Sequence, residues 1–268
     1  MATRCRAVSK GQLTNDALVI APHFDDETLG CGGTIVRKLE AGAAVNVAFM
    51  TDGAASHSHH LPPDELRDIR RREADAATRV LGLKATSISC AELPDGMLGA
   101  HQTDAVDHVA ELIERLRPAE LYVPHLSDGQ DDHRATTTAA LEARALTGSS
   151  AEVFEYPVWH WQQWPWVRLA SPLRRHQWRG AELHGPAWRR SASNAFGLRF
   201  ARSVNRFVDI SGATKRKRSA LDCYTSQMVA PAEAEEWATL HDVSYGDFLR
   251  RLLDDREYFR CTNPATYA

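Results

Sequence analysis

The sequence predicts an α/β fold with a doubly wound, mostly parallel sheet. Through the first half of the chain, short apolar runs of strand type alternate with longer segments of helical period. Glycines close several of these segments, as at Gly42 and Gly82. Strands that alternate with helices pair in parallel through right-handed crossovers, so we expect a Rossmann-like sheet with helices on both faces.

The elements of this first half follow one another in a regular order. The clearest helix covers residues 63–83, where Leu66, Ile69, Ala77 and Leu81 lie close to helical spacing. The predicted strands are 17–23, 44–53, 85–90 and 120–125. The predicted helices are 28–42, 63–83, 104–116 and 133–146.

The second half of the chain is less regular. Six of the seven tryptophans fall between Trp159 and Trp188, together with several arginines. We expect residues 1–268 to form a single domain: an α/β core over 1–150, a Trp/Arg-rich insertion over 157–200, and a last strand with C-terminal helices over 201–268. The insertion is expected either to pack a small core of its own or form an oligomer interface, or to stack its tryptophan rings on a sugar.

Composition narrows the functional classes. A net charge of -3 predicts no nucleic-acid partner. The five cysteines are scattered without a CxxC pair, which is typical of reduced thiols and predicts a cytoplasmic protein. The sequence contains no apolar run long enough for a signal peptide or a membrane span, so we expect neither. Assembly into a homo-oligomer stays open.

A histidine and three acidic residues crowd the end of the first predicted strand. His23 is followed closely by Asp25, Asp26 and Glu27. Carboxylates at this spacing repel one another, and their burial is costly unless they are paired or bind a metal. A capped helix start explains one or two of the acids, because Asp favours helix N-termini, but it does not explain the histidine.

A second polar cluster opens the helix after another predicted strand. There Asp131 and Asp132 precede His133. Doubly wound sheets bind ligands beyond the carboxyl ends of their strands, and both clusters lie at such ends. Two histidines and a carboxylate with open positions are what a catalytic divalent metal requires. The spacing therefore predicts a metal site.

These segments resemble the signature of the PIG-L/LmbE-like family of N-acetylglucosaminyl deacetylases. Members of this family carry a His-Pro-Asp-Asp-Glu run after the first strand and a later Asp-His pair. The resemblance covers most of the chain in order. Further matching segments are 51–53 (TDG), 69–83, 95–96 (DG), 131–135 (DDHRA), 155–159 (EYPVW) and 215–227 (KRKRSALDCYTSQ).

The resemblance implies a metal site built by His23, Asp26 and His133. Zn²⁺ is the usual ion of the family, with another divalent metal such as Fe²⁺ as the alternative. Asp25 would then be the general base, and Arg70 falls where the family has an arginine that faces the active site.

One more acidic residue of the second cluster receives a role from the resemblance. Asp132 would hold His133 in the tautomer that binds metal, as carboxylates beside metal-bound histidines usually do.

Two positions depart from the family pattern. Phe24 replaces the usual proline, which should alter only the turn. Gln130 stands where many members have a histidine that steadies the oxyanion, and a glutamine can donate a hydrogen bond but cannot carry a proton charge. Either Gln130 serves as a neutral donor or His125 takes this role.

The function implied is removal of the acetyl group from an N-acetylglucosamine-type amino sugar or glycoconjugate. A metal-bound water would attack the amide carbonyl while Asp25 takes its proton. The partner would be this small-molecule substrate.

Two alternatives come from other functional classes. His23, Asp25 and His133 also match the HxD…H triad of non-haem iron oxygenases, although those enzymes usually have β-sandwich folds. A non-catalytic sugar-binding module would use the tryptophans and would not need an intact metal set.

Three further motifs favour structural interpretations. The histidines of 57–60 (HSHH) are expected on a solvated rim of the active site, and the basic run 215–218 (KRKR) on a solvated helix face. The glycines of 29–33 (LGCGG) lack the GxGxxG spacing, so we expect them to allow close packing of a helix on the sheet.

Overall fold

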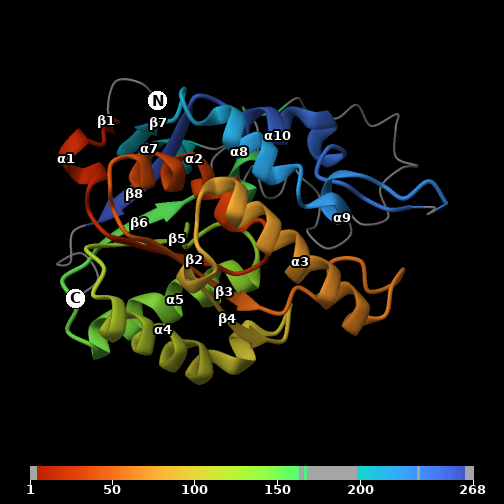
Figure 1. The fold of residues 1–268 in the computed structure, drawn as a ribbon, viewed down its shortest axis with the longest axis horizontal. Helices are drawn as coiled ribbons and strands as arrows, with labels where there is room; N and C mark the ends of the chain where they lie inside the picture. Colours follow the sequence, from red (N-terminus) through yellow and green to blue (C-terminus); the bar gives the residue numbers. More distant parts are fainter. Residues whose placement is uncertain (1–4, 163–165, 168–197, 234–235, 263–268) are drawn as a thin grey trace.

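A computed structural model describes residues 5–162, 166–167, 198–233 and 236–262 of the 268. A single eight-stranded sheet runs through the middle of the molecule, and helices cover both of its faces (Figure 1). The predicted α/β class and mostly parallel sheet are confirmed.

The element boundaries are close to those predicted in the first half. The strands are β1 (Arg6–Ala7), β2 (Ala17–Ala21), β3 (Val45–Thr51), β4 (Ile88–Leu93), β5 (Glu120–Pro124), β6 (Glu152–Tyr156), β7 (Arg206–Asp209) and β8 (Arg256–Thr262). The α-helices are α1 (Lys10–Leu13), α2 (Asp26–Glu40), α3 (Pro63–Leu81), α4 (Gln102–Leu116), α5 (Asp131–Leu146), α7 (Leu198–Ser203), α8 (Thr214–Leu221), α9 (Thr225–Met228) and α10 (Asp247–Leu252). The 3₁₀ turns are η1 (Ala85–Ser87), η2 (Leu98–His101), η3 (Trp159–Gln162) and η6 (Val243–Gly246).

The order of the strands creates a switch point at the centre of the sheet. The order is β1-β7-β8-β6-β5-β2-β3-β4, and β2 pairs in parallel with both β3 and β5. The chain therefore leaves β2 toward one edge, through β3 and β4, and then returns to β5 and continues toward the other edge. In such sheets the loops that follow the two central strands diverge and leave a crevice at their carboxyl ends.

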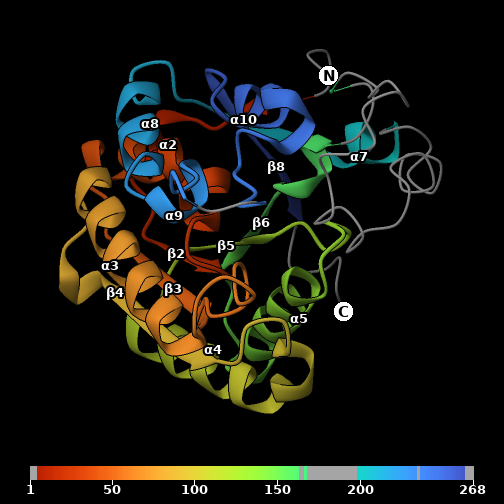
Figure 2. The same cartoon turned by 90° about the vertical axis from the view of Figure 1, so that its right-hand side faces the viewer.

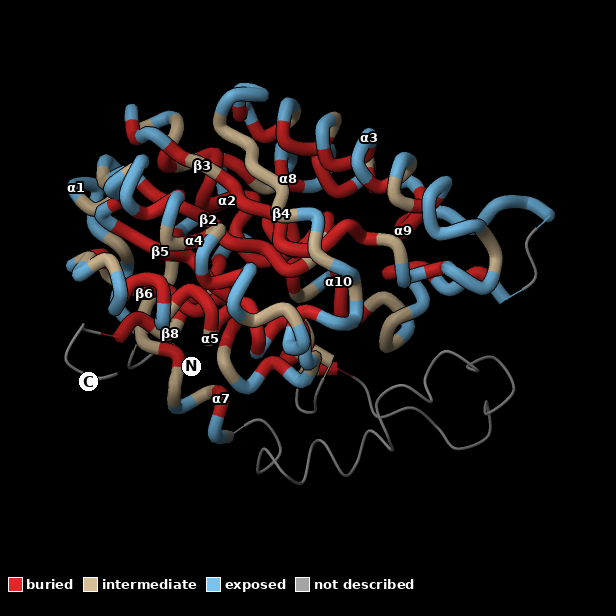
Figure 3. The backbone as a smooth tube through the Cα atoms, turned by 90° about the horizontal axis from the view of Figure 1, so that it is seen from below, coloured by how far each residue is buried: buried red, intermediate tan, exposed pale blue. Residues whose placement is uncertain are grey.

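Two apolar cores lie on the two faces of the sheet. Alternate residues of a strand point to opposite faces, so Val19 joins the core beneath α2, α3 and α8, whereas Leu18 and Ile20 join the core beneath α4 and α5. Figure 2 shows these two groups of helices on either side of the strands. Figure 3 shows the buried residues gathered in the interior of the molecule and the exposed residues toward its outside. Both faces are thus covered, as a parallel sheet requires.

The C-terminal part differs from the prediction. Helices were expected to follow the last strand within residues 201–268, but 256–262 form β8, which pairs antiparallel with both β6 and β7. Phe259 and Cys261 of this strand are buried. Tyr258 and Phe259 stand next to each other and interrupt a strict polar–apolar alternation, so the sequence pattern did not indicate a strand here.

The glycines of α2 allow the close packing that was predicted. A Cβ atom on Gly30 would lie 2.3 Å from the ring of Tyr156, and one on Gly33 would lie 2.6 Å from Ile210. Neither position can hold a larger side chain without displacing its neighbour, so α2 lies directly on these side chains.

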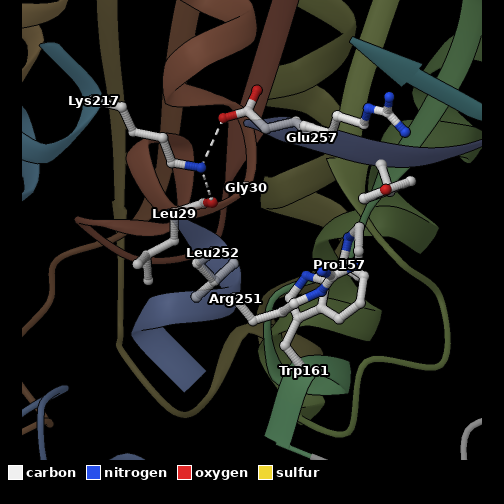
Figure 4. Close-up of a pocket in the computed structure, with 10 residues that line it drawn as sticks. Leu29, Gly30, Pro157, Trp161, Lys217, Arg251, Leu252 and Glu257 are labelled. Atoms are coloured by element: carbon white, nitrogen blue, oxygen red, sulfur yellow. Dashed lines mark hydrogen bonds and ion pairs between the residues drawn. The ribbon is translucent and has the colours of Figure 1, made fainter. Parts of the chain in front are cut away.

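The basic run 215–218 is only partly solvated. Lys217 is fully buried, and its ammonium group donates to Glu257 at 2.7 Å and to the carbonyl of Leu29 at 2.9 Å (Figure 4). The expectation of a solvated face is wrong for this residue. Lys217 instead fastens α8 to the start of α2, beside a small pocket that also includes Trp161 and Arg251.

Among the residues that the structure describes, no helix is both long and apolar enough to cross a bilayer.

Candidate metal and active site

The two predicted polar clusters meet at the switch point. His23 follows β2, Asp26 is the first residue of α2, and His133 lies in the first turn of α5 after β5. Asp26 Oδ2 lies 3.1 Å from His23 Nδ1 and 3.2 Å from His133 Nε2. The topology therefore brings together residues 110 positions apart in the sequence, because the strands that carry them are neighbours in the sheet.

These three residues fit a divalent cation. One ligand atom from each lies within 4.8 Å of the others. His133 Nε2 is buried and has no hydrogen-bond partner of acceptable geometry, so it keeps a position that a metal ion would satisfy. Two imidazoles and one carboxylate are typical of catalytic zinc sites, which keep further positions open.

The electrostatics of the site agree with a cation between these groups. Burial alone would raise the pKa of Asp26, but the neighbouring His133 and His23 hold it well below its usual range. Burial opposes a charge on His133 as well, yet Asp26 and Asp128 raise its pKa to about 9. The site thus favours positive charge next to ionised carboxylates, which is the charge that a bound metal ion supplies.

The orientation of His133 depends on a residue that the sequence analysis did not select. Its Nδ1 lies 3.0 Å from Oδ2 of the buried Asp128, and the Asp128 carboxylate also accepts the backbone N–H groups of residues 158–160. Asp132, which was expected in this role, makes its side-chain hydrogen bonds to other residues and not to His133. The two are consecutive on α5, and consecutive helical side chains point about 100° apart around the axis.

Asp132 instead faces the other histidine of the site. Its Oδ2 lies 3.3 Å from His23 Nε2, and its two oxygens accept the backbone N–H groups of Gly96 and Leu98. Asp95 Oδ1 lies 3.2 Å from the same nitrogen of His23. Each histidine of the set therefore has carboxylate partners on its second nitrogen. Asp95 belongs to the matching segment 95–96, and that match was its only signal in the sequence.

Asp25 stands apart from the three grouped residues. It is mostly buried, and its Oδ2 lies 3.4 Å from Nη2 of Arg70. Burial raises the pKa of Asp25 to about 8, although the charge of Arg70 opposes the shift. Arg70 also donates to the carbonyl of Phe24 and, at 3.1 Å, to Ser56 Oγ. A carboxyl group with a raised pKa beside a metal-ligand set is suited to accepting and returning a proton.

The structure distinguishes the two candidates for the oxyanion donor. Gln130 is the N-cap residue of α5 and is partly exposed, and its side chain makes no capping hydrogen bond. His125 is buried with partners on both nitrogens: Ser203 at Nε2, and Ser127 and His160 at Nδ1. Burial lowers the pKa of His125 to about 4. Of these two candidates, Gln130 is the one whose side chain makes no hydrogen bond to another described residue.

One histidine of the run 57–60 is buried, contrary to expectation. The His57 ring is 4 % exposed and stacks on Trp237 with 4.1 Å between the ring centroids. Its Nε2 donates to the carbonyl of Ala238, and its Nδ1 accepts from Gln227. The expectation of a solvated rim is therefore wrong for His57, which ties the loop after β3 to the C-terminal segment.

Much of the Trp/Arg-rich segment lies outside the described residues, including Trp164, Trp178, Trp188 and the arginines from 168 to 190. Trp161 is buried and packs edge-on against Phe200. Arg251 lies over the rings of Trp161 and Trp166. These two tryptophans belong to the packing between η3, α7 and α10.

The chain is similar in sequence to known deacetylases. Residues 18–144 match the sequence model of the PIG-L family, described as GlcNAc-PI de-N-acetylase. The chain is 28 % identical over 249 residues to a 1D-myo-inositol 2-acetamido-2-deoxy-alpha-D-glucopyranoside deacetylase of Rhodococcus erythropolis. The aligned region covers 81 % of this chain and 83 % of that protein. It is 25 % identical over 217 residues to the diacetylchitobiose deacetylase of Thermococcus kodakarensis, covering 78 % of this chain and 69 % of that protein.

A solved structure shows the same fold. The N,N'-diacetylchitobiose deacetylase of Pyrococcus horikoshii superposes with a TM-score of 0.65 and 22 % identity, covering 95 % of this chain and 86 % of that one. The matched residues 18–144 contain all three grouped residues, His23, Asp26 and His133. The resemblance of the chain to the PIG-L family is therefore confirmed over residues 18–144.

Proposed function

We propose that this protein is a zinc-dependent hydrolase that removes the acetyl group from an N-acetylated amino sugar. The observation that carries the proposal is the grouping of three possible metal ligands, His23, Asp26 and His133. The neighbouring Asp25 is not part of this group, so its carboxyl group is available for proton transfer. The named activities of the two curated relatives, both deacetylases of acetamido sugars, support the substrate class.

The residues of the chain divide the work between holding the cation and moving protons. His23, Asp26 and His133 would hold the ion, which supplies the Lewis acidity that acidifies water and polarises an amide carbonyl. Asp25 takes the proton from the attacking water and later gives it to the leaving amine. Arg70 orients the Asp25 carboxylate through an ion pair, with 3.4 Å between Arg70 Nη2 and Asp25 Oδ2.

Charge also develops on the acetyl oxygen during the attack. A neutral donor can stabilise this oxyanion without any change in its own protonation. The Gln130 side chain lies at the start of α5, three residues before His133, and is free of other hydrogen bonds among the described residues. We assign this role to Gln130 rather than to His125, because both nitrogens of His125 already have partners.

The alternatives receive less support. An HxD…H oxygenase would use Asp25 as a ligand, whereas the carboxylate between the two histidines is that of Asp26. A sugar-binding module would not require a buried imidazole nitrogen without a hydrogen-bond partner. A cytoplasmic location remains our proposal, supported by the five free thiols.

The test combines two measurements on purified protein. Metal content is determined first, and release of free amine is then followed over a panel of N-acetylglucosaminyl compounds, with Zn²⁺ or Fe²⁺ restored to chelated protein. We expect one divalent ion per chain and amine release that depends on it. Full metal loading without amine release from any compound of the panel would reject the deacetylase proposal.

A further inference from the structure

Asp25 occupies the N-cap position of α2 but does not cap the helix. An N-cap residue normally has an extended backbone, and its side chain accepts a hydrogen bond from the first turn. The carbonyl of Asp25 does accept from the N–H groups of Thr28 and Leu29, as an N-cap carbonyl should. Its carboxylate makes no capping hydrogen bond and lies beside Arg70 instead.

The backbone of Asp25 has an unusual conformation that permits this orientation. Its φ is 118° and its ψ is -27°. Residues other than glycine rarely adopt a positive φ of this kind. Such a conformation is unfavourable by itself and persists only where the surrounding structure imposes it. Some neighbouring group must therefore hold Asp25 in place.

The Glu27 side chain contacts the backbone of Asp25 directly. Its side chain is completely buried, and its Oε2 accepts the backbone N–H of Asp25 at 3.2 Å. The other oxygen accepts from the hydroxyl of Tyr224 at 2.7 Å and from the hydroxyl of Thr28. Tyr224 is also fully buried and comes from the matching segment 215–227, so the C-terminal part of the chain reaches the start of α2 through this contact.

We propose that Glu27 is a positioning residue for Asp25: it accepts the Asp25 backbone N–H, and the Asp25 carboxylate is thereby left free to face Arg70. The inference rests on the proposed function, in which Asp25 moves the proton. Glu27 touches neither Arg70 nor any of the three grouped residues through a hydrogen bond of its side chain. Its effect on the reaction therefore passes through Asp25.

The contacts predict which substitutions are tolerated. In Glu27→Gln the amide oxygen can still accept from Asp25, and the amide NH₂ can donate to the Tyr224 hydroxyl, which also accepts hydrogen bonds. In Glu27→Leu the size is similar but both acceptors are lost, so the buried N–H of Asp25 has no partner. The Asp25 backbone should then relax to a negative φ and withdraw its carboxylate.

The experiment measures kcat and metal content on these two variants. We expect Glu27→Gln to stay near the wild type, and Glu27→Leu to lose up to about 10²-fold in kcat, the cost of misplacing a reacting group by about 1 Å. Metal content should be unchanged in both. Thr28→Val serves as the matched control, because it removes a hydroxyl from the same carboxylate without touching the bond to Asp25.

A double-mutant cycle separates positioning from general structural damage. If Glu27 acts through the Asp25 carboxylate, adding Glu27→Leu to Asp25→Asn should lower kcat no further. A further loss equal to that of Glu27→Leu alone, or a loss of metal from Glu27→Leu, overturns the inference. The same holds if Glu27→Gln is as impaired as Glu27→Leu.

A second readout does not depend on activity. Crystal structures of Glu27→Leu and Glu27→Gln should show Asp25 at negative φ in the first variant and at positive φ in the second. A wild-type protein that releases no amine would reject the proposed function, whereas a positive φ kept in Glu27→Leu would reject the role of Glu27.

Discussion

The turn after β2 and the turn after β5 each contribute a histidine to the metal-ligand set, but they hold it differently. His133 is fully buried, and its carboxylate partner Asp128 lies five residues earlier in the same turn. The His23 side chain is 18 % exposed, and its partners Asp95 and Asp132 come from the loop after β4 and from the first turn of α5. One turn is self-contained, whereas the other is completed by neighbours that are distant in the sequence.

The difference indicates a division of labour. A self-contained and buried turn holds its histidine rigidly, which suits an anchor for the metal ion. The accessible turn carries Asp25 at a positive φ and depends on Glu27 and Arg70 to keep it there. Strain of this kind is typical of residues that take part in the chemistry. We therefore expect substitutions in the two turns to differ in kind.

The largest effects should come from the two aspartates of the first turn. Asp26→Asn should lose metal, because a neutral amide oxygen is a much poorer ligand than a carboxylate. Asp25→Asn should keep the metal and lose about 10²–10⁴-fold in kcat, because an amide cannot accept the proton. Metal content and amine release are measured on both variants under identical loading. Metal lost from Asp25→Asn and kept by Asp26→Asn would revive the iron oxygenase alternative.

The second turn should contain one residue that acts on the rate alone. Gln130→Ala should cost roughly 10²–10³-fold in kcat without loss of metal, the range for removing one oxyanion donor. His125→Ala provides the comparison, and it should act mainly on stability, since its nitrogens bond to Ser203 and His160. Steady-state kinetics and urea unfolding of both variants decide between them. The role passes to His125 if its variant loses kcat at unchanged stability while Gln130→Ala is active.

A smaller effect should distinguish the carboxylates that orient the histidines. Asp128→Asn should weaken metal binding about 10–100-fold, as is usual when the partner of a metal-bound histidine is removed. Asp132→Asn should weaken it less, because Asp95 still faces His23. Competition with a chelator measures the affinities, and Asp131→Asn, on the exposed side of the same helix turn, is the control. Equal losses at 128 and 132 would contradict the difference between the two turns.

The last prediction concerns the stability of the protein in mild acid rather than its activity. Burial lowers the pKa of both His125 and His160 to about 4, below the value of about 6.5 for an unfolded histidine. The unfolded chain therefore binds more protons between these values, and stability should fall as pH falls from about 6.5 toward 4, by up to about tenfold in the folding constant per pH unit for each residue.

Urea midpoints of metal-free protein at several pH values test this dependence. His160→Gln should make the midpoint less dependent on pH than in the wild type, whereas His101→Gln, on the surface, should follow the wild type. A wild-type midpoint that stays constant from pH 7 to pH 5 would show that the two buried histidines do not contribute in this way.

The sequence was sufficient for the features that depend on local pattern. Alternating apolar runs predicted the parallel sheet, and helical spacing predicted α3 to within two residues at its end. Both polar clusters lie between a predicted strand and the next predicted helix, and the ends of parallel strands share one edge of a sheet, so a site could be expected there. The resemblance to the PIG-L family selected His23, Asp26 and His133 within these clusters. Asp128 was missed although it is local, because an acidic residue in a polar turn gives no signal until its partner is known.

The tertiary structure alone decided which carboxylate serves which histidine and how Asp25 is held. Asp132 was expected beside His133, but its direction on α5 takes it to His23. Tertiary packing also sets the partners of four further residues, which are distant in the sequence: Asp95, Lys217, His57 and Tyr224. Sequence pattern reports the residue types that can bind a metal and the elements that carry them. The direction of each side chain depends on the packing of elements far apart in the chain, and that packing was settled only by the complete fold.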